Sequence, residues 1–113
     1  MQIKIRSNRA IGGAIQAPPS KSMAHRAVLC AALAKGVSHI RNLEFSKDIS
    51  ATLSAAGQLC ARVETGLDNA VVEGLGSFRP IDAPVDCCES GSTLRFLIPL
   101  ASLTGQPVTF VGH

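Results

Sequence analysis

The sequence predicts an α/β fold built from repeated β-α-β-α-β-β units, one unit complete and a second truncated. Apolar runs of helical length alternate with short β-branched stretches, and Gly and Pro mark their boundaries. Two segments also look alike. Residues 18–26 and 88–95 each contain Ser-x-Ser followed by an Arg one turn later, then an apolar run, a Gly and a β-branched stretch. This likeness indicates that one structural unit begins twice.

Two short strands are expected before the first helix. Residues 2–6 alternate with Ile3 and Ile5 on one face, which is typical of a strand. A Gly pair follows, and residues 14–17 form a second strand that Pro18 and Pro19 end. The first unit therefore runs from about residue 14 to residue 74, and residues 1–13 precede it.

The first helix is predicted at residues 21–34. Ser20 is a good N-cap, and Gly36 is placed as the residue that follows the C-cap. The first turn is polar, whereas residues 27–34 are apolar all round. Such a helix is expected to be buried along its length and to present only its N-terminal end to a polar site.

A strand at residues 37–40 and a second helix complete the first half of the unit. Ser46 caps this helix, Ile49, Leu53 and Ala56 recur at helical spacing, and Gly57 is expected to end it. Asp48 suits the positive end of the helix dipole. Strands at 59–64 and 70–73 then form a hairpin.

The second unit is predicted to cover residues 84–113. It contains a strand at 85–87, a helix at 91–103 that Gly105 closes, and a strand at 108–111. Pro99 lies inside this helix and should kink or shorten it. The unit stops at His113 before its second helix, so the pattern is unfinished.

The composition favours a globular protein that acts on small anions. Of the 113 residues 46% are apolar and 17% charged, which excludes a disordered chain. The net charge of +3 is dispersed, and Trp and Tyr are absent, unlike a nucleic-acid binder. No apolar run is long enough to span a membrane, so a cytoplasmic location is expected. Cys30 and Cys60 are expected to be buried, reduced thiols, and the Cys87-Cys88 pair to pack at a strand end.

The two Ser-x-Ser segments supply the candidate site residues. A helix N-terminus offers free backbone N–H groups and a positive dipole to an anion. Lys21 is unfavourable there, which makes it either a functional residue or a solvated surface Lys. Ser22 and Arg26 share a helix face. Gly91 permits close approach of a ligand, and Ser92 and Thr93 either donate hydroxyls or cap. Arg95 either parallels Arg26 or forms a salt bridge with Glu89 or Asp86, and His25 is expected to be structural.

These motifs resemble those of the EPSP synthase (3-phosphoshikimate 1-carboxyvinyltransferase) family. Pro-Pro-Ser-Lys-Ser-x-x-x-Arg at residues 18–26 is similar to the first motif of that family, and Glu-Ser-Gly-Ser-Thr-Leu-Arg-Phe at 89–96 to the second. Glu89 stands where Asn is common and Ser92 where Thr is common. The likeness covers the whole chain, which would be an N-terminal fragment with part of one substrate-binding domain at residues 14–113. Residues 1–13 would then belong with the opposite domain.

The resemblance implies transfer of the enolpyruvyl group from phosphoenolpyruvate to shikimate 3-phosphate, by addition and then elimination. Lys21 would bridge both substrates and help in proton transfer, Ser22 and Arg26 would bind shikimate 3-phosphate, Gly91 and Ser92 would lie at phosphoenolpyruvate, and Arg95 would support that wall. It implies no metal or organic cofactor and no nucleic-acid or membrane partner. A monomer is expected at full length, and the fragment alone is expected to be inactive.

Two alternatives stay open at this point. A UDP-N-acetylglucosamine enolpyruvyl transferase shares the repeat, but the residue after its motif Lys is typically Asn and not Ser22. A nucleic-acid-end-binding module of the same repeat is disfavoured by the few aromatic residues.

Overall fold

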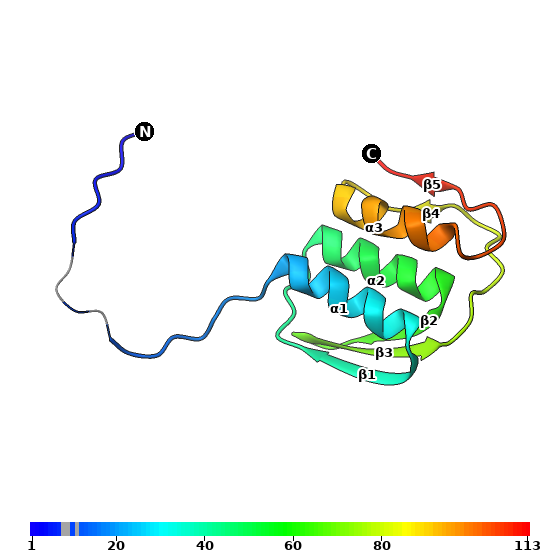
Figure 1. Ribbon diagram of the computed structural model, residues 1–113, viewed down its shortest axis with the longest axis horizontal. Helices are drawn as coiled ribbons and strands as arrows, with labels where there is room; N and C mark the ends of the chain where they lie inside the picture. The colour runs from blue at the N-terminus through cyan, green and yellow to red at the C-terminus, as the bar shows by residue number, and fades with distance from the viewer. Residues whose placement is uncertain (8–9, 11) are drawn as a thin grey trace.

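Three parallel helices stacked over a small sheet form the body of the protein. The computed structural model describes residues 1–7, 10 and 12–113. The elements are α1 (Lys21–Leu33), β1 (Lys35–Arg41), α2 (Lys47–Leu59), β2 (Ala61–Thr65), β3 (Asn69–Leu75), β4 (Val85–Asp86), α3 (Gly91–Ala101) and β5 (Phe110–Val111). Helices α1 and α2 cover one face of the sheet, and α3 lies on their far side with β4 and β5 (Figure 1). The predicted α/β class is confirmed.

The sheet has the order β1-β3-β2, with both outer strands antiparallel to β3. Val72 of β3 is fully buried between Ser38 of β1 and Val63 of β2. The hairpin between β2 and β3 is confirmed, although β2 begins at Ala61 and not at residue 59. Strands β4 and β5 make a separate parallel pair, which brings the end of the chain beside the start of α3.

The two strands predicted before α1 are wrong. Residues 2–6 and 14–17 form no strand, and Ile3, Ile5 and Ile15 are exposed. A strand is stable only where a neighbour pairs with its N–H and C=O groups, and nothing in the described part of the chain pairs with these residues. Residues 8, 9 and 11 of the predicted 1–13 segment lie outside the described residues. The observed first unit is therefore α-β-α-β-β over residues 21–75.

Serine caps set the starts of the three helices α1, α2 and α3 that the structure describes. The Oγ atoms of Ser20, Ser46 and Ser90 accept hydrogen bonds from the backbone N–H groups three residues later. The first two caps were predicted. None of the helices in the described residues is long and apolar enough to cross a membrane.

The predicted helix ends are less accurate than the starts. The C-cap of α1 is Ala34, and the strand β1 follows it directly. Gly36 lies within β1 and therefore does not end the helix, contrary to the prediction. Gly57 lies inside α2 and does not end it, because one Gly in a helix interior costs only about 1 kcal/mol relative to Ala. α3 ends at Ala101, two residues earlier than predicted, with Pro99 in its last turn.

One side of α1 is open to solvent, which corrects the prediction that the helix is buried along its length. Ala24, Val28 and Ala32 face the core, whereas Met23, Cys30 and Leu33 are exposed on the opposite side. No element of the described chain covers that side. The expectation of a buried thiol is therefore wrong for Cys30 and confirmed for Cys60.

The C-terminal end of α1 crosses β3 at very short range. A Cβ atom placed on Gly74 would lie 1.7 Å from the carbonyl oxygen of Ala34 and 2.6 Å from that of Ala31. Only a residue without a side chain fits this crossing. Gly74 thus fixes the height of α1 above the sheet.

Candidate functional site

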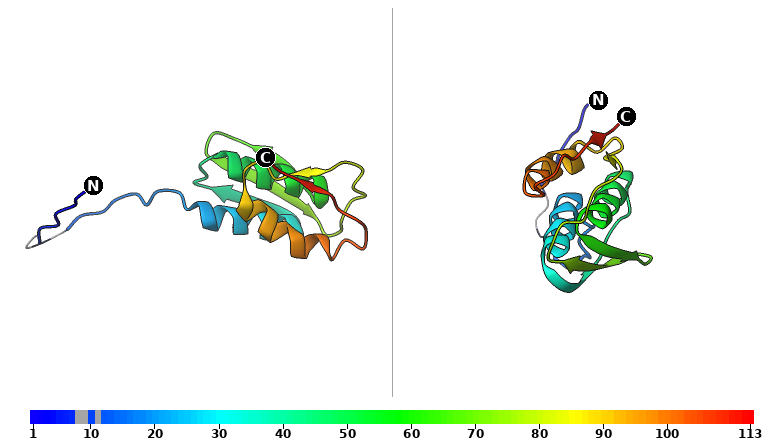
Figure 2. Two further views of the ribbon diagram at one scale, coloured as in Figure 1. Left: turned by 90° about the horizontal axis from the view of Figure 1, so that it is seen from above. Right: turned by 90° about the vertical axis from the view of Figure 1, so that its right-hand side faces the viewer.

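The N-terminal ends of α1, α2 and α3 lie together at one end of the molecule, as two perpendicular views agree (Figures 1 and 2). Each start carries backbone N–H groups that have no partner within the helix, and the three dipoles point the same way. The candidate residues of both Ser-x-Ser segments are at this end. The fold therefore concentrates positive potential where the sequence predicts anion binding.

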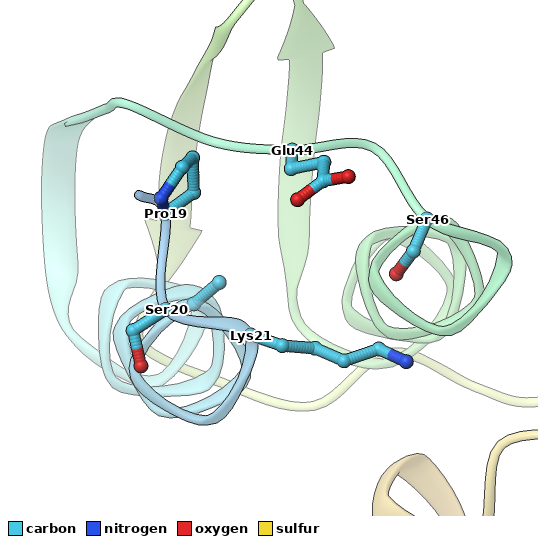
Figure 3. A pocket seen from close by; sticks show the side chains of 6 residues that line it. Pro19, Ser20, Lys21, Glu44 and Ser46 are labelled. Atoms are coloured by element: carbon cyan, nitrogen blue, oxygen red, sulfur yellow. The ribbon is translucent and has the colours of Figure 1, made fainter. Parts of the chain in front are cut away.

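Lys21 forms an ion pair with Asp48, which lies in the first turn of α2. Figure 3 shows the Lys21 side chain stretched from the start of α1 towards α2. The partner carboxylate offsets the repulsion between the cation and the dipole of α1. The ammonium side chain is still 55% exposed. Lys21 is therefore an anchored cation and not a freely solvated surface Lys.

A small cavity of about 150 Å³ lies between the starts of α1 and α2. It is lined by Pro19, Ser20, Lys21, Ala24, Glu44 and Ser46 (Figure 3). The carboxylate of Glu44 lies in this cavity and disfavours an anion there. The anion site supported by the three helix starts thus lies outside this cavity.

Arg26 connects α1 with α3. Its guanidinium carbon lies 5.8 Å from the centroid of the Phe96 ring, within the range of a cation–π contact. Its Nη1 also donates to the carbonyl oxygen of Ser22 at 3.3 Å. Arg26 itself is exposed, so its remaining N–H groups are free to bind a ligand.

The residues predicted around the start of α3 have open surroundings. Gly91 is exposed, and a Cβ atom placed there would meet no atom within 4 Å. Ser92 is half-buried and Arg95 is exposed. The alternative of a salt bridge from Arg95 to Glu89 or Asp86 is not found among the described residues, and Glu89 pairs with Lys47 at 3.8 Å. The cap of α3 is Ser90 and neither Ser92 nor Thr93.

A buried chain of hydrogen bonds joins the three helices behind this surface. His25 Nδ1 lies 2.7 Å from Thr52 Oγ1, which lies 2.7 Å from Thr93 Oγ1. Thr93 Oγ1 lies 2.6 Å from Ser90 Oγ. All four residues are less than 5% exposed. The burial of His25 agrees with the structural role predicted for it, but its hydrogen-bond partners were not anticipated.

The surroundings of His25 favour its neutral form. Burial lowers its pKa from the usual 6.5, Asp48 opposes this shift, and Lys21 adds to it. The sequence did contain one signal for the network. Thr52 recurs with Ile49 and Ala56 at helical spacing, which places a hydroxyl on the buried face of α2.

The Cys87-Cys88 pair follows β4 directly. Cys87 is buried, as packing at a strand end predicts, and Cys88 has a left-handed backbone with φ of 50°. The Cys88 N–H donates to Asp86 Oδ1 at 2.7 Å and so holds the turn into α3. Neither thiol forms a disulfide in the described part of the chain.

The donors present suit anion binding. Among the described residues there is no group of three or more His, Cys, Asp or Glu side chains able to hold a metal ion. Lys21 and Arg26 are cations held by neighbouring side chains, and the starts of α1, α2 and α3 present backbone N–H groups at the same end of the molecule.

Comparisons with known proteins identify the family of the chain. The model of the EPSP synthase (3-phosphoshikimate 1-carboxyvinyltransferase) family matches residues 5–113. The 3-phosphoshikimate 1-carboxyvinyltransferase of Clostridium kluyveri is 46% identical over 101 residues, covering 89% of this chain and 24% of that protein. The Clostridium beijerinckii protein of the same name is 47% identical over 110 residues, covering 91% of this chain and 25% of that protein. The chain thus spans about a quarter of the length of these relatives.

The fold is also that of a solved relative. An EPSP synthase from Acinetobacter baumannii superposes with a TM-score of 0.82 at 23% identity, covering 89% of this chain and 23% of that one. A second structure of EPSP synthase from the same organism gives a TM-score of 0.81 at 24% identity, covering 94% of this chain and 25% of that one.

Proposed function

The chain belongs to the EPSP synthase family, and from this premise we propose that it provides one wall of the active site of an enolpyruvyl transferase. The reaction moves the enolpyruvyl group of phosphoenolpyruvate to shikimate 3-phosphate and releases phosphate. The observation that carries the proposal is the meeting of three helix N-termini at one end of the molecule, where Lys21 of α1 pairs with Asp48 of α2. Both substrates carry several negative charges, and the positive ends of the three helix dipoles attract such anions.

Lys21 is proposed to bridge the two substrates and to take part in proton transfer. An ammonium group has three N–H donors, and the ion pair with Asp48 leaves donors free for substrate oxygens. Because Asp48 fixes the long side chain, less rotamer freedom is lost when a ligand binds. Positioning of this kind is the main contribution that a protein makes when both reactants are bound side by side.

The two neighbouring helices are proposed to divide the substrates between them. Ser22 and Arg26 on α1 bind shikimate 3-phosphate, with the Arg26 guanidinium held over Phe96. Gly91 and Ser92 at the start of α3 bind phosphoenolpyruvate, since the open space at Gly91 lets a ligand reach the backbone N–H groups. Arg95 supports that side of the site.

The two alternative functions have less support. The curated relatives described above are 3-phosphoshikimate 1-carboxyvinyltransferases, and Ser22 already disfavours the UDP-N-acetylglucosamine enzyme. No observation favours nucleic-acid binding. The complete enzyme is proposed to act in the cytoplasm, because its substrates are small and water-soluble. It is also proposed to be a monomer, which size-exclusion chromatography tests.

A chimera tests the proposed function. Residues 5–113 replace the matching segment of the Clostridium kluyveri enzyme, and phosphate release is measured with both substrates. We expect turnover by the chimera, loss of turnover in Lys21→Met, and none from the 113-residue chain alone, because a positioned second wall is needed to exclude water. A folded chimera that releases no phosphate beside an active parent enzyme would refute the assignment.

A second lysine provides a control that separates the position of Lys21 from its charge. Lys47 is also the first residue of a helix, and its side chain is 79% exposed. Lys47→Met removes the same charge from the neighbouring helix start. Retained turnover in Lys47→Met, against loss in Lys21→Met, would show that the position and not the net charge matters.

A further inference from the structure

We propose that His25, Thr52 and Thr93 are positioning residues that hold the N-terminal ends of α1, α2 and α3 in the one arrangement in which Lys21 and Gly91 face the same substrates. The inference rests on the proposed function but concerns residues that face away from the ligand surface. Each of the three belongs to a different helix, and each is at most 1% exposed.

The chain of hydrogen bonds reaches both halves of the site. At one end, the backbone carbonyl of Asp48 accepts from the Thr52 and Thr93 hydroxyls, at 3.2 and 3.3 Å, while its carboxylate binds Lys21. At the other end, Thr93 N–H donates to Ser90 Oγ at 3.1 Å, and Gly91 lies between these two residues. A shift of one helix relative to the others would break at least one of these contacts.

Counting hydrogens assigns the tautomer of His25. The contacts His25–Thr52, Thr52–Thr93 and Thr93–Ser90, together with the two contacts to the Asp48 carbonyl, call for five hydrogens. The three hydroxyls supply only three. A fourth contact is filled when His25 donates from Nδ1–H, which no apolar residue at this position could do, so this tautomer satisfies one contact more than the Nε2–H tautomer does.

The same assignment leaves Nε2 as a bare acceptor. This atom is buried and has no hydrogen-bond partner in the described part of the chain. Unpaired buried polar atoms cost stability, so a side chain chosen for stability alone would be apolar. The presence of His25 is explained by its Nδ1–H donor and the alignment that this donor completes.

The test uses the chimera and pairs each disruptive variant with a conservative one. Thr93→Val removes the hydroxyl at nearly constant volume, and Thr93→Ser keeps it. His25→Leu removes the donor, and His25→Asn keeps an N–H at nearly the same position. We expect Thr93→Val and His25→Leu to lower kcat by about 10- to 100-fold, the effect of a displacement of about 1 Å among reacting groups. Thr93→Ser and His25→Asn should restore most of kcat.

Val72→Ala serves as the control for stability alone. Val72 is as buried as Thr93 but lies in the sheet and outside the network. It should lower the denaturation midpoint and leave kcat and both KM values unchanged. If Thr93→Val and His25→Leu behave like Val72→Ala, the three residues are merely structural and the inference is wrong.

A measurement independent of turnover examines the network itself. Long-range ¹⁵N–¹H NMR of the histidine-labelled chimera should show His25 as the Nδ1–H tautomer, with the signal identified by its loss in His25→Leu. An Nε2–H tautomer would overturn the hydrogen count and the inference with it. An unmodified chimera that is folded and shows the expected tautomer but no turnover would instead overturn the proposed function.

Discussion

The two ends of the helix layer are held together in different ways. At the N-terminal end, His25, Thr52 and Thr93 join three helices through hydrogen bonds of 2.7 Å between side chains. At the C-terminal end of α1, the backbone at Ala34 rests directly on Gly74 of β3, with no side chain between them. Hydrogen bonds fix direction as well as distance, whereas close packing fixes distance alone.

The hydrogen bonds at one end of the helix layer and the close packing at the other agree with different roles of the two ends. The packed end determines whether α1 can lie on the sheet at all, so we expect its variants to act mainly on stability. The hydrogen-bonded end carries Lys21 and Gly91, whose relative position matters for ligands. Variants there should change function more than their cost in stability suggests. The following changes test this contrast, from the largest expected effect on stability to the smallest.

Gly74→Ala should be the most destabilising change. Its Cβ would overlap the Ala34 carbonyl oxygen, and backbone atoms cannot move aside without displacing α1. We expect a loss of about 4 kcal/mol or more in the free energy of unfolding, measured by urea denaturation. Gly57→Ala, at a helix position with open space, is the matched control and should raise stability by up to about 1 kcal/mol. Equal effects of both changes would refute the close crossing.

Thr52→Val should have a smaller effect at the other end. It leaves the partners of a buried hydroxyl unpaired, so the free energy of unfolding should fall by about 1–3 kcal/mol. A double-mutant cycle with Thr93→Val should show coupling, because the two hydroxyls bond each other. Thr52→Ser provides the control that keeps the hydroxyl. Additive losses in the cycle would mean that the two residues act independently.

The pH dependence of stability should report on His25. Burial lowers its pKa below 6.5, so as the pH falls past 6.5 the unfolded chain binds a proton that the folded chain does not. Stability is therefore fully present above 6.5 and declines as the pH falls towards the lowered pKa. Unfolding is measured between about pH 7.5 and 5.5, a range in which carboxylates stay ionised. His25→Asn should flatten the decline, whereas removal of the exposed His39 by His39→Asn should leave it in place.

Lys21→Met should change stability least. Its ion pair is more than half exposed, and such pairs contribute about 0–1 kcal/mol. The same variant should nevertheless abolish turnover in the chimera, so the ratio of functional to structural effect is largest here. A loss of stability comparable to that of Gly74→Ala would show that Lys21 holds the fold together and would contradict the contrast between the two ends.

The sequence was sufficient to predict the features that depend on neighbouring residues. Ser20 and Ser46 as caps, and the hairpin after β2, follow from local hydrogen bonding and turn chemistry. Strands at 2–6 and 14–17 were wrong because pairing depends on partners elsewhere. The candidate residues at the starts of α1 and α3 could be selected from their motifs, and these two helix starts do lie at one end.

The network could not be predicted because its contacts join residues far apart in sequence. Thr52 and Thr93 are separated by 41 positions, and a Thr in a helix usually indicates an exposed site. The anchoring of Lys21 by Asp48 was missed for the same reason, since Asp48 alone reads as an ordinary residue at a helix start. Both the network and the ion pair depend on how the helices are placed relative to one another, which neighbouring residues in the sequence do not determine.

The open side of α1 gives the protein a chemical label. Cys30 is exposed there, whereas Cys60 and Cys87 are buried and burial raises the pKa of both thiols. Since the thiolate is the reactive form, an alkylating reagent should modify Cys30 well before these two. The rate of Cys30 alkylation would show whether another segment covers the open side of α1. A slower rate in the chimera than in the 113-residue chain would mean that this side becomes covered, and following the rate during refolding would show when.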